Sequence, residues 1–390
     1  MKKTLKIIII LSCILTINIK AEEFNIQSKN AILYNLTDGE IIYEKNSGEK
    51  IQIASLTKIM TALIAIENID NINKQIVITK EDLKGIPEQN LVAAGFTVGE
   101  IVTYEDLLYG LLLPSGADAA SAIARNTSDD FIKLMNDKAK ELKLINTRFN
   151  NPIGLDDENN YSTVEELLTI FKEALTKEEF KKIITSKEYT TTDGKLTFKS
   201  TIQRNAKKYG IEVPYIEGGK TGTTDGAGLC LASIAKDENI DLILITAKAP
   251  YDKKGPHHIE DAKTIYDYYI KKYNNQKIVD KTKSFKKIKT KYIKENYVKL
   301  YPEKDIIKYL PDNYKKEDII LKYKGKNIIK YNDKGKIGTL KIYYKNKLLD
   351  TQNIMIKRKY KFSLKKYIKD NLMIISIIII LLIIIIKRVI

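Results

Sequence analysis

The spacing of hydrophobic positions divides this 390-residue chain into stretches of predicted strand and predicted helix. Two short apolar runs, 31–34 and 40–43, flank the turn residues Asp38 and Gly39, which predicts an antiparallel hairpin. Over 55–68 the apolar residues occupy more than one face of a helix, and a helix of that kind is buried in a core. The pattern therefore predicts a hairpin followed by a core helix.

Helical spacing then continues to about residue 180, where strand patterns return. Strands from both ends of 22–272 enclose this helical middle. That order predicts an α/β (α+β) layer structure, an antiparallel sheet flanked by helices with an inserted helical subdomain. The predicted helices of the middle are 104–113, 117–125 and 129–144, the later strands are 189–192, 195–200, 229–235 and 241–247, and a closing helix spans 259–272.

Shorter alternating runs follow at 318–323, 327–331 and 337–344, separated by turn residues such as Lys324-Gly325. They predict a small antiparallel all-β domain over 276–356, in which we find no candidate catalytic cluster. Residues 357–370 form a Lys-rich linker in front of a strongly apolar C-terminal run.

The N-terminal residues have the composition of an export signal. Three lysines and the apolar run 7–19 precede Ala21, which is the layout of a secretory signal peptide over 1–21. Because Ile19 stands where a small residue is usual, an uncleaved N-terminal anchor is the alternative.

At the other end, 372–386 is apolar apart from Ser376 and is followed by Lys387 and Arg388. Its fifteen residues rise about 22 Å as a helix, short of the roughly 30 Å hydrocarbon core, but flanking residues can snorkel and the bilayer can thin. We expect a single-pass transmembrane anchor over 371–388, with its basic end in the cytoplasm and the body of the chain outside the cell membrane.

The formal net charge of +17 is concentrated in one part of the chain. Residues 21–270 carry 29 Lys and Arg against 39 Asp and Glu, a balance of −10, whereas residues 271–370 carry 31 against 10, a balance of +21. A basic block beside a membrane segment in an exported chain indicates anionic lipid or wall polymer as its partner, and not nucleic acid. A compositional bias toward Lys, Ile, Asn and Tyr is the alternative explanation.

Cysteine and histidine are too few for a disulfide framework or a zinc site. If Cys13 leaves with the signal, Cys230 is the only thiol and no internal disulfide forms. Cys230 lies in an apolar, strand-like run, which favours a small buried core residue over a reactive thiol. His257 and His258 are the only histidines, so we expect no metal.

Ser55 and Lys58 are the first candidates for chemistry. Three residues apart on a helix they share a face, so the amine can reach the hydroxyl and take its proton. A lysine does this only when it is partly neutral, a state favoured by burial among apolar neighbours such as Ile53, Ile59 and Met60. The alternative is an N-capping serine with a lysine that reaches solvent, and Ser-x-x-Lys alone does not separate the two.

Two further motifs favour a catalytic role for Ser55 and Lys58 over the capping alternative. Ser115 lies at a break between two apolar helical segments, followed by Gly116 and Ala117. Lys220-Thr221-Gly222 follows two glycines, whose backbone lets a ligand approach closely, and offers a cation and a hydroxyl to an anionic group. Each motif alone is compatible with an ordinary turn. Together, at separations of 60 and 105 residues, the three motifs predict one site.

This set resembles the penicillin-recognising serine enzymes, whose motifs are Ser-x-x-Lys, Ser-x-Asn and Lys-Thr-Gly. Within that group the chain is most similar to the D-alanyl-D-alanine carboxypeptidases, the low-molecular-mass penicillin-binding proteins. The additional matches are 147–156, 161–163 and 260–262 ahead of Tyr268. The resemblance covers 24–272, and the β domain and the anchor also fit the architecture of the family.

The resemblance implies hydrolysis of the terminal D-Ala from peptidoglycan pentapeptide stems through an acyl-enzyme. It also implies β-lactams as covalent inhibitors and no metal or organic cofactor. In the reaction, Ser55 is the expected nucleophile, Lys58 its proton acceptor and Ser115 the relay to the leaving amine. The backbone N–H groups of Ser55 and Thr223 are the expected oxyanion hole, worth about 3 to 4 kcal/mol. The residues expected to bind substrate are Lys220, Thr221, Gly222, Thr223 and His258.

Two positions depart from the pattern of the family. Ala117 stands where Asn is usual, and that Asn normally helps to hold the substrate amide and the lysine of the first motif. Its absence puts efficiency and β-lactam affinity in question. His258 stands where many members carry Arg, and we expect it either to bind the substrate carboxylate when protonated or to be a surface histidine beside His257.

Two other functions stay open at this point. A β-lactamase shares the motifs but needs a dedicated base, and no Glu-x-x-Leu-Asn element lies between Ser115 and Lys220, where 151–155 stands instead. A membrane-anchored wall-binding protein with a degenerate site is the second, suggested by Ala117 and the basic β domain. Release of D-Ala and turnover of penicillin separate the three functions.

Overall fold

The computed structural model describes residues 25–238, 240–252 and 254–389. The chain forms two compact units, one ending at Ile270 and one beginning at Lys271. The predicted signal peptide, 1–21, lies outside the described residues.

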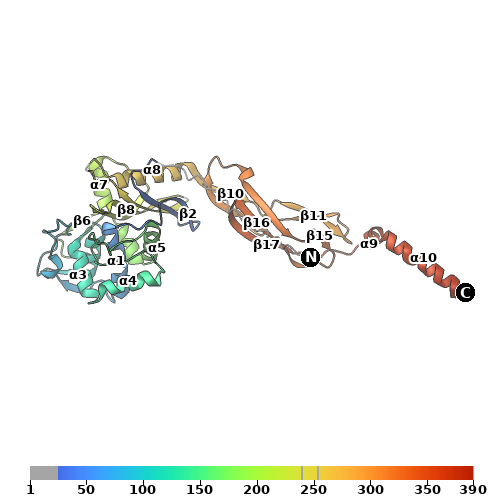
Figure 1. The fold of residues 1–390 in the computed structure, drawn as a ribbon, viewed down its shortest axis with the longest axis horizontal. Coiled ribbons are helices and arrows are strands. Elements are labelled where there is room, and N and C mark those ends of the chain that lie inside the picture. Colours follow the sequence, from blue (N-terminus) through green and yellow to red (C-terminus); the bar gives the residue numbers. More distant parts are fainter. Residues whose placement is uncertain (1–24, 239, 253, 390) are drawn as a thin grey trace, which may run out of the picture. The chain divides into compact units, whose positions relative to one another are not determined.

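A five-stranded antiparallel sheet organises the first unit (Figure 1). Its strands are β1 (Asn30–Asn35), β2 (Glu40–Lys45), β7 (Ile216–Thr224), β8 (Gly228–Asp237) and β9 (Ile240–Ala249), in the spatial order β2-β1-β9-β8-β7. The predicted hairpin forms β1 and β2, with Gly39 at φ +72° in the connecting turn. Because β1 also pairs with β9, strands from the two ends of the unit meet in one sheet, as the sequence pattern predicts.

Helices cover both faces of this sheet, which explains why β8 and β9 are nearly continuous apolar runs. On one face Tyr266 of α8 (His257–Lys272) lies 3.0 Å from Ser233 of β8, hydroxyl to hydroxyl. On the other face Ile243 and Ile245 of β9 join the main core with α1 (Thr57–Asn68) and α5 (Val164–Leu175). In Figure 1, α8 and α5 accordingly lie on opposite sides of the sheet.

The inserted helices lie between β2 and β7 in sequence and build the main core. Helix α1 is buried from Thr57 to Ala65, which agrees with its apolar residues on more than one face. The other helices are α2 (Tyr104–Leu112), α3 (Ala117–Thr127), α4 (Phe131–Glu141), α6 (Glu178–Ile184) and α7 (Thr201–Tyr209). Two short antiparallel pairs are β3 (Gln75–Val77) with β4 (Ile101–Thr103) and β5 (Glu188–Thr190) with β6 (Thr197–Lys199).

The second unit consists mainly of strands around a small core of its own. Strand β10 (Tyr273–Val279) pairs with β13 (Ile306–Pro311). A second sheet holds β12 (Tyr297–Leu300), β11 (Lys286–Lys291) and β15 (Ile328–Lys330) in that order, and a third holds β14 (Ile319–Gly325), β16 (Gly335–Tyr344) and β17 (Lys347–Ile356).

One strand pairing in this unit differs from the predicted antiparallel arrangement. Strands β11 and β15 run parallel. A parallel pair needs a long connection, and the chain between these two strands is long enough to include β12, β13 and β14. The alternation of apolar and polar residues indicates a strand but not the direction of its partner.

The C-terminal residues form α9 (Leu364–Asp370) and α10 (Leu372–Val389). The predicted linker is therefore helical in its second half, where the Ser363 hydroxyl accepts a hydrogen bond from the Lys366 backbone N–H and caps α9. Within the described ranges no single helix is long and apolar enough to cross a membrane, whereas α9 and α10 meet that requirement as a pair bent by 79°.

Candidate active site

Ser55 and Lys58 lie where a 3₁₀ turn, η1 (Ala54–Leu56), leads into α1. Lys58 Nζ is 3.0 Å from Ser55 Oγ and donates a 2.7 Å hydrogen bond to the carbonyl oxygen of Ile153. The start of α1 has no side-chain cap, so the alternative of an N-capping serine is wrong. The spacing of three residues brings the hydroxyl and the amine together.

Burial changes the chemistry of Lys58. Its side chain is 1% exposed, and this loss of hydration lowers the pKa of Lys58 to about 7, against the attraction of Asp118, which raises it. A large fraction of the Lys58 amine is therefore neutral at neutral pH. A neutral amine at this distance can accept the Ser55 proton.

Ser115 and Lys220 form a second hydroxyl–amine pair. Lys220 Nζ donates to Ser115 Oγ at 2.7 Å and to the carbonyl oxygen of Thr221 at 2.7 Å. Lys220 is fully buried, and burial followed by repulsion from Lys58 lowers its pKa well below the ordinary value. That repulsion shows that the two amines share one electrostatic environment.

Two residues of the site have strained backbones. Ala54, next to the nucleophile candidate, has φ +46°, and Ser115 has φ +74°. Residues other than glycine rarely adopt this left-handed region, at a cost on the order of 1 to 3 kcal/mol each. These left-handed residues lie at or next to the two serines, so the surrounding structure must offset their strain at the site.

The Lys-Thr-Gly motif lies inside the edge strand β7 and not in a turn before a strand, which corrects the interpretation of its glycine-rich sequence. A Cβ at Gly218 would lie 2.1 Å from the Ile184 carbonyl oxygen, and one at Gly219 would lie 2.2 Å from the Ala232 carbonyl oxygen. These two glycines are therefore needed for close packing against the backbone of Ile184 and Ala232, and not for the approach of a ligand. Gly222 lets β7 pass beside Ser55, because a Cβ there would be 3.0 Å from the Ser55 amide nitrogen.

The two threonines of this strand differ in environment. The Thr221 hydroxyl is buried and donates to Thr201 Oγ1 at 2.8 Å, at the start of α7. Thr223 is exposed at the free edge of β7, one residue beyond Gly222. The structure thus gathers Ser55, Lys58, Ser115 and the 220–223 segment in one place.

A loop after α4 completes the surroundings of Lys58, and its role was not predicted. Asn151 Oδ1 accepts from the backbone N–H groups of Ile153, Gly154 and Leu155, which fixes the Ile153 carbonyl that Lys58 contacts. Gly154 has φ +89°, and a Cβ there would lie 2.0 Å from the Ala54 carbonyl oxygen. The loop therefore packs directly on the turn that carries Ser55.

Asp156 ties the same loop to the end of β7. Its carboxylate accepts from the Thr224 hydroxyl at 2.6 Å and from the Gly226 backbone N–H at 2.9 Å. The loop thus connects the first and third motifs. The Asn-Pro-x-Gly sequence is the signal that could have indicated a tight turn here.

Asp118 is a second residue that sequence reasoning missed. It is fully buried beside Ala117, and its carboxylate accepts hydrogen bonds from the backbone N–H groups of Ala94, Gly95, Phe96 and Ala119. It is also the acidic group that attracts the Lys58 ammonium. Asp118 therefore holds the 94–96 loop against the second motif.

His258 contradicts one of the two expectations for it, that of a surface histidine. Its side chain is 2% exposed in the first turn of α8, so it is not a surface histidine. Burial, with a smaller contribution from His257, lowers the pKa of His258 to about 4, so the ring is neutral at pH 7. Its ring nitrogens have no hydrogen-bond partner among the described residues. Binding of the substrate carboxylate by a protonated His258 stays a prediction.

Cys230 is a free, fully buried residue of β8, as its apolar surroundings predicted. Burial raises the pKa of its thiol to about 12, so it is not a reactive thiolate. In the described ranges no group of three or more His, Cys, Asp or Glu side chains could hold a metal ion.

The fold is similar to those of solved bacterial cell-wall enzymes described as a DD-transpeptidase and a penicillin-binding protein. The Streptomyces K15 DD-transpeptidase shares 28% identity and a TM-score of 0.57, covering 63% of this chain and 98% of that protein. Penicillin-binding protein 5 from Haemophilus influenzae shows similarity of fold, with 23% identity and a TM-score of 0.63 over 87% of this chain and 98% of its own.

Sequence comparison gives the family. The sequence model of a peptidase family described as D-alanyl-D-alanine carboxypeptidase matches residues 17–250. The D-alanyl-D-alanine carboxypeptidase DacF of Bacillus subtilis is 31% identical over 291 residues, 72% of each chain, and DacC of Escherichia coli is 30% identical over 238 residues, 59% of this chain and 58% of its own. The chain therefore belongs to the D-alanyl-D-alanine carboxypeptidase family, and with it to the serine-type hydrolases that bind penicillin, which confirms the resemblance seen in the three motifs.

Proposed function

We propose that Ser55 is the nucleophile with which this enzyme removes the terminal D-Ala from peptidoglycan pentapeptide stems. The observation that carries the proposal is the 3.0 Å contact between Ser55 Oγ and a buried lysine whose pKa is lowered to about 7. The β-strand edge beside that contact offers a place for an extended peptide.

In the acylation step, Ser55 Oγ attacks the carbonyl carbon of the penultimate D-Ala and its proton passes to the neutral Lys58 amine. The carbonyl oxygen becomes an oxyanion, for which the backbone N–H groups of Ser55 and Thr223 are the candidate donors. Gly222 supports this assignment, because β7 passes so close to Ser55 that a Cβ at Gly222 would lie only 3.0 Å from the Ser55 amide nitrogen.

Collapse of the tetrahedral intermediate breaks the peptide bond and releases D-Ala as its amine takes up a proton. Ser115 is suited to deliver this proton. Its oxygen accepts from Lys220 at 2.7 Å, so its own O–H is free to point toward the leaving nitrogen. Water then attacks the Ser55 ester, returning a proton through the same groups and freeing the shortened stem.

Lys220 is the candidate for attracting the substrate carboxylate, because its amine lies beside Ser115 at the edge of β7. Its depressed pKa means that a bound carboxylate, by contributing negative charge, would restore the ammonium form. Because the Lys220 amine lies directly beside Ser115, we assign the carboxylate to Lys220 first and keep His258 as a second candidate.

The predicted cellular setting belongs to the same proposal. We infer that the chain is exported by residues 1–21, held to the membrane by 371–388, and inhibited covalently by β-lactams at Ser55. The apolar composition of α10 and the two basic residues that end it support the anchor.

The test is a paired assay on the purified chain and on its Ser55→Ala variant. We expect wild type to release D-Ala from a D-Ala-D-Ala peptide and to retain labelled penicillin, and the variant to do neither. Rapid turnover of penicillin without D-Ala release would indicate a β-lactamase instead. Silence in both assays would indicate a wall-binding protein, an outcome that the intact Ser55, Lys58, Ser115 and Lys220 contacts argue against.

A further inference from the structure

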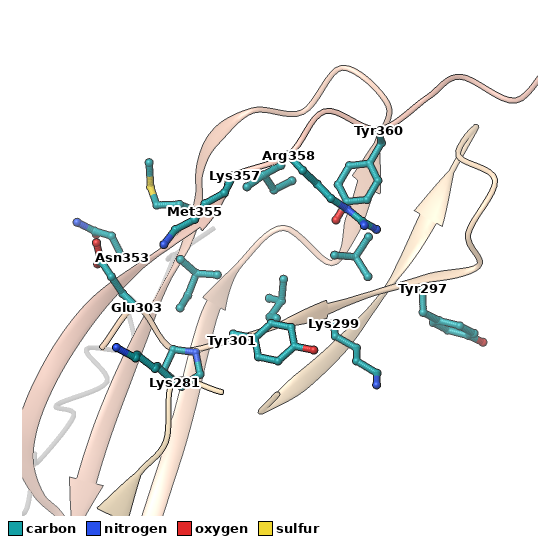
Figure 2. A pocket seen from close by; sticks show the side chains of 15 residues that line it. Lys281, Tyr297, Lys299, Tyr301, Glu303, Asn353, Met355, Lys357, Arg358 and Tyr360 are labelled. Carbon is teal, nitrogen blue, oxygen red and sulfur yellow. The ribbon is translucent and has the colours of Figure 1, made fainter. Parts of the chain in front are cut away.

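The second unit contains a groove of about 650 Å³ that plays no part in the reaction described above. It lies between two strands that each end a sheet, β12 and β17. Figure 2 shows Lys299 and Tyr301 on one side and Met355, Lys357, Arg358 and Tyr360 on the other. Its size is in the range of sites that hold ligands of several rings.

Positive charge dominates the lining of this groove. Lys281, Lys299, Lys357 and Arg358 line it against one acidic residue, Glu303. Arg358 lies 3.4 Å from Glu295, whereas the three lysines form no ion pair within the described part of the chain. Lysine side chains that are not held in an ion pair can form charge-assisted hydrogen bonds with an anionic ligand that enters the groove.

Aromatic rings accompany these charges. Tyr297 and Tyr301 are 55% and 42% exposed, and the Arg358 guanidinium lies 4.7 Å from the centre of the Tyr360 ring. An exposed tyrosine supplies a flat apolar surface with a hydroxyl at its end, which suits a ring that carries both apolar and polar faces. Ring surfaces interleaved with cations are the features expected for a polymer of ring-shaped, negatively charged units.

We propose that this groove binds an anionic glycan, and specifically a peptidoglycan strand through its sugar rings and free carboxylates. The inference rests on the proposed function, because it takes the substrate polymer to be the partner. The positive residues line a groove between two edge strands, and a single polymer strand fits such a groove better than a flat lipid surface does.

The experiment measures cosedimentation of the full-length chain, in detergent, with insoluble peptidoglycan from which attached polymers have been removed. The groove variant is Lys299→Ala, Tyr301→Ala and Lys357→Ala. The matched control removes two exposed lysines and an exposed tyrosine elsewhere in the same unit: Lys324→Ala, Lys336→Ala and Tyr331→Ala. Release of D-Ala from a small soluble peptide is measured for all three proteins.

We expect the groove variant to bind peptidoglycan at least about tenfold more weakly than wild type, and the control to stay within about twofold. Amidation of the peptidoglycan carboxylates should weaken wild-type binding in the same way. Activity on the soluble peptide should be equal in all three proteins, so a failure of the proposed function would appear there and not in the sedimentation.

Equal binding by the groove variant and wild type would overturn the proposal. An equal loss in the control would also overturn it, because it would show a general effect of charge. A third contrary result is a groove variant that binds peptidoglycan normally but partitions less into phosphatidylglycerol vesicles, which would make the groove a lipid site.

Discussion

Lysine serves opposite purposes in the two units of this protein. In the first, Lys58 and Lys220 are buried and burial lowers the pKa of each, so that the amines can exchange protons. In the second, lysines such as Lys299 and Lys357 are exposed to solvent and line a groove. The same side chain therefore supports proton transfer where the fold removes water and anion binding where it does not.

The two units also differ in what surrounds their lysines. The first unit packs a large core that extends from the sheet through the inserted helices, whereas the described core cluster of the second is much smaller. Burying an amine opposes folding, so a site with two of them requires a large apolar core. The reactive site thus lies in the unit that is best able to support it.

The largest expected effect comes from replacing a buried amine by an apolar side chain of similar length. Lys58→Met removes the proton acceptor and should lower kcat/KM for D-Ala release by about 10³-fold, while the loss of a desolvated amine keeps or raises the thermal midpoint. The matched change Lys324→Met, at an exposed lysine of the second unit, should leave activity unchanged. Activity of Lys58→Met within tenfold of wild type would show that the buried lysine is not needed for proton transfer.

The next effect concerns the loop that fixes the surroundings of Lys58. Gly154→Ala places a Cβ 2.0 Å from the Ala54 carbonyl oxygen and should destabilise the fold by about 3 kcal/mol in urea unfolding, with reduced acylation of Ser55. The control is Gly194→Ala, where φ is +76° but nothing lies within 4 Å of the added Cβ. That variant should cost about 1 kcal/mol. Equal costs would show that the contact with the Ser55 turn is unimportant.

A buried histidine provides a smaller effect with a defined sign. The folded-state pKa of His258 is about 4, below the unfolded value of 6.5, so the unfolded chain binds its proton first as pH falls. The contribution of neutral His258 to the free energy of unfolding is fully present above pH 6.5. It should decline by about 3 kcal/mol in total between pH 6.5 and 4. In His258→Phe the free energy of unfolding should fall by about 3 kcal/mol less over this pH range than in wild type. An identical pH dependence of unfolding in the variant would contradict the assignment.

Exposed lysines of the second unit should give the smallest effect on stability. Lys336→Ala is expected to change the free energy of unfolding by less than about 0.5 kcal/mol, because its side chain is exposed on β16. A cost above 1 kcal/mol in urea unfolding would mean that the basic surface takes part in folding as well as in binding.

Much of this architecture could be predicted from sequence where a local pattern and the tertiary context agree. The hairpin around Gly39 and the buried helix α1 follow directly from turn chemistry and apolar spacing. The pairing of Ser55 with Lys58 follows from helix geometry. In each case the deciding interactions lie within a few residues of one another.

The features that could not be predicted depend on distant contacts. Strand β7 looks like a loop in sequence because its glycines are needed for approach to Ile184 and Ala232, far from it in the chain. The left-handed backbone of Ala54 and Ser115 has no signal in the residue types. The burial of His258 and the parallel pairing of β15 likewise depend on the assembled fold.

The most direct test of the central claim is the pH dependence of Ser55 acylation, measured as the pre-steady-state rate with a chromogenic β-lactam. Because the neutral Lys58 amine must accept the proton, the rate should fall about tenfold per pH unit below an apparent pKa near 7. Lys58→Arg, whose side chain stays charged, should be acylated slowly at every pH, and its rate should not show this fall below pH 7. A wild-type rate that falls below an apparent pKa near 10, or a fall near pH 7 in the variant as well, would contradict the account.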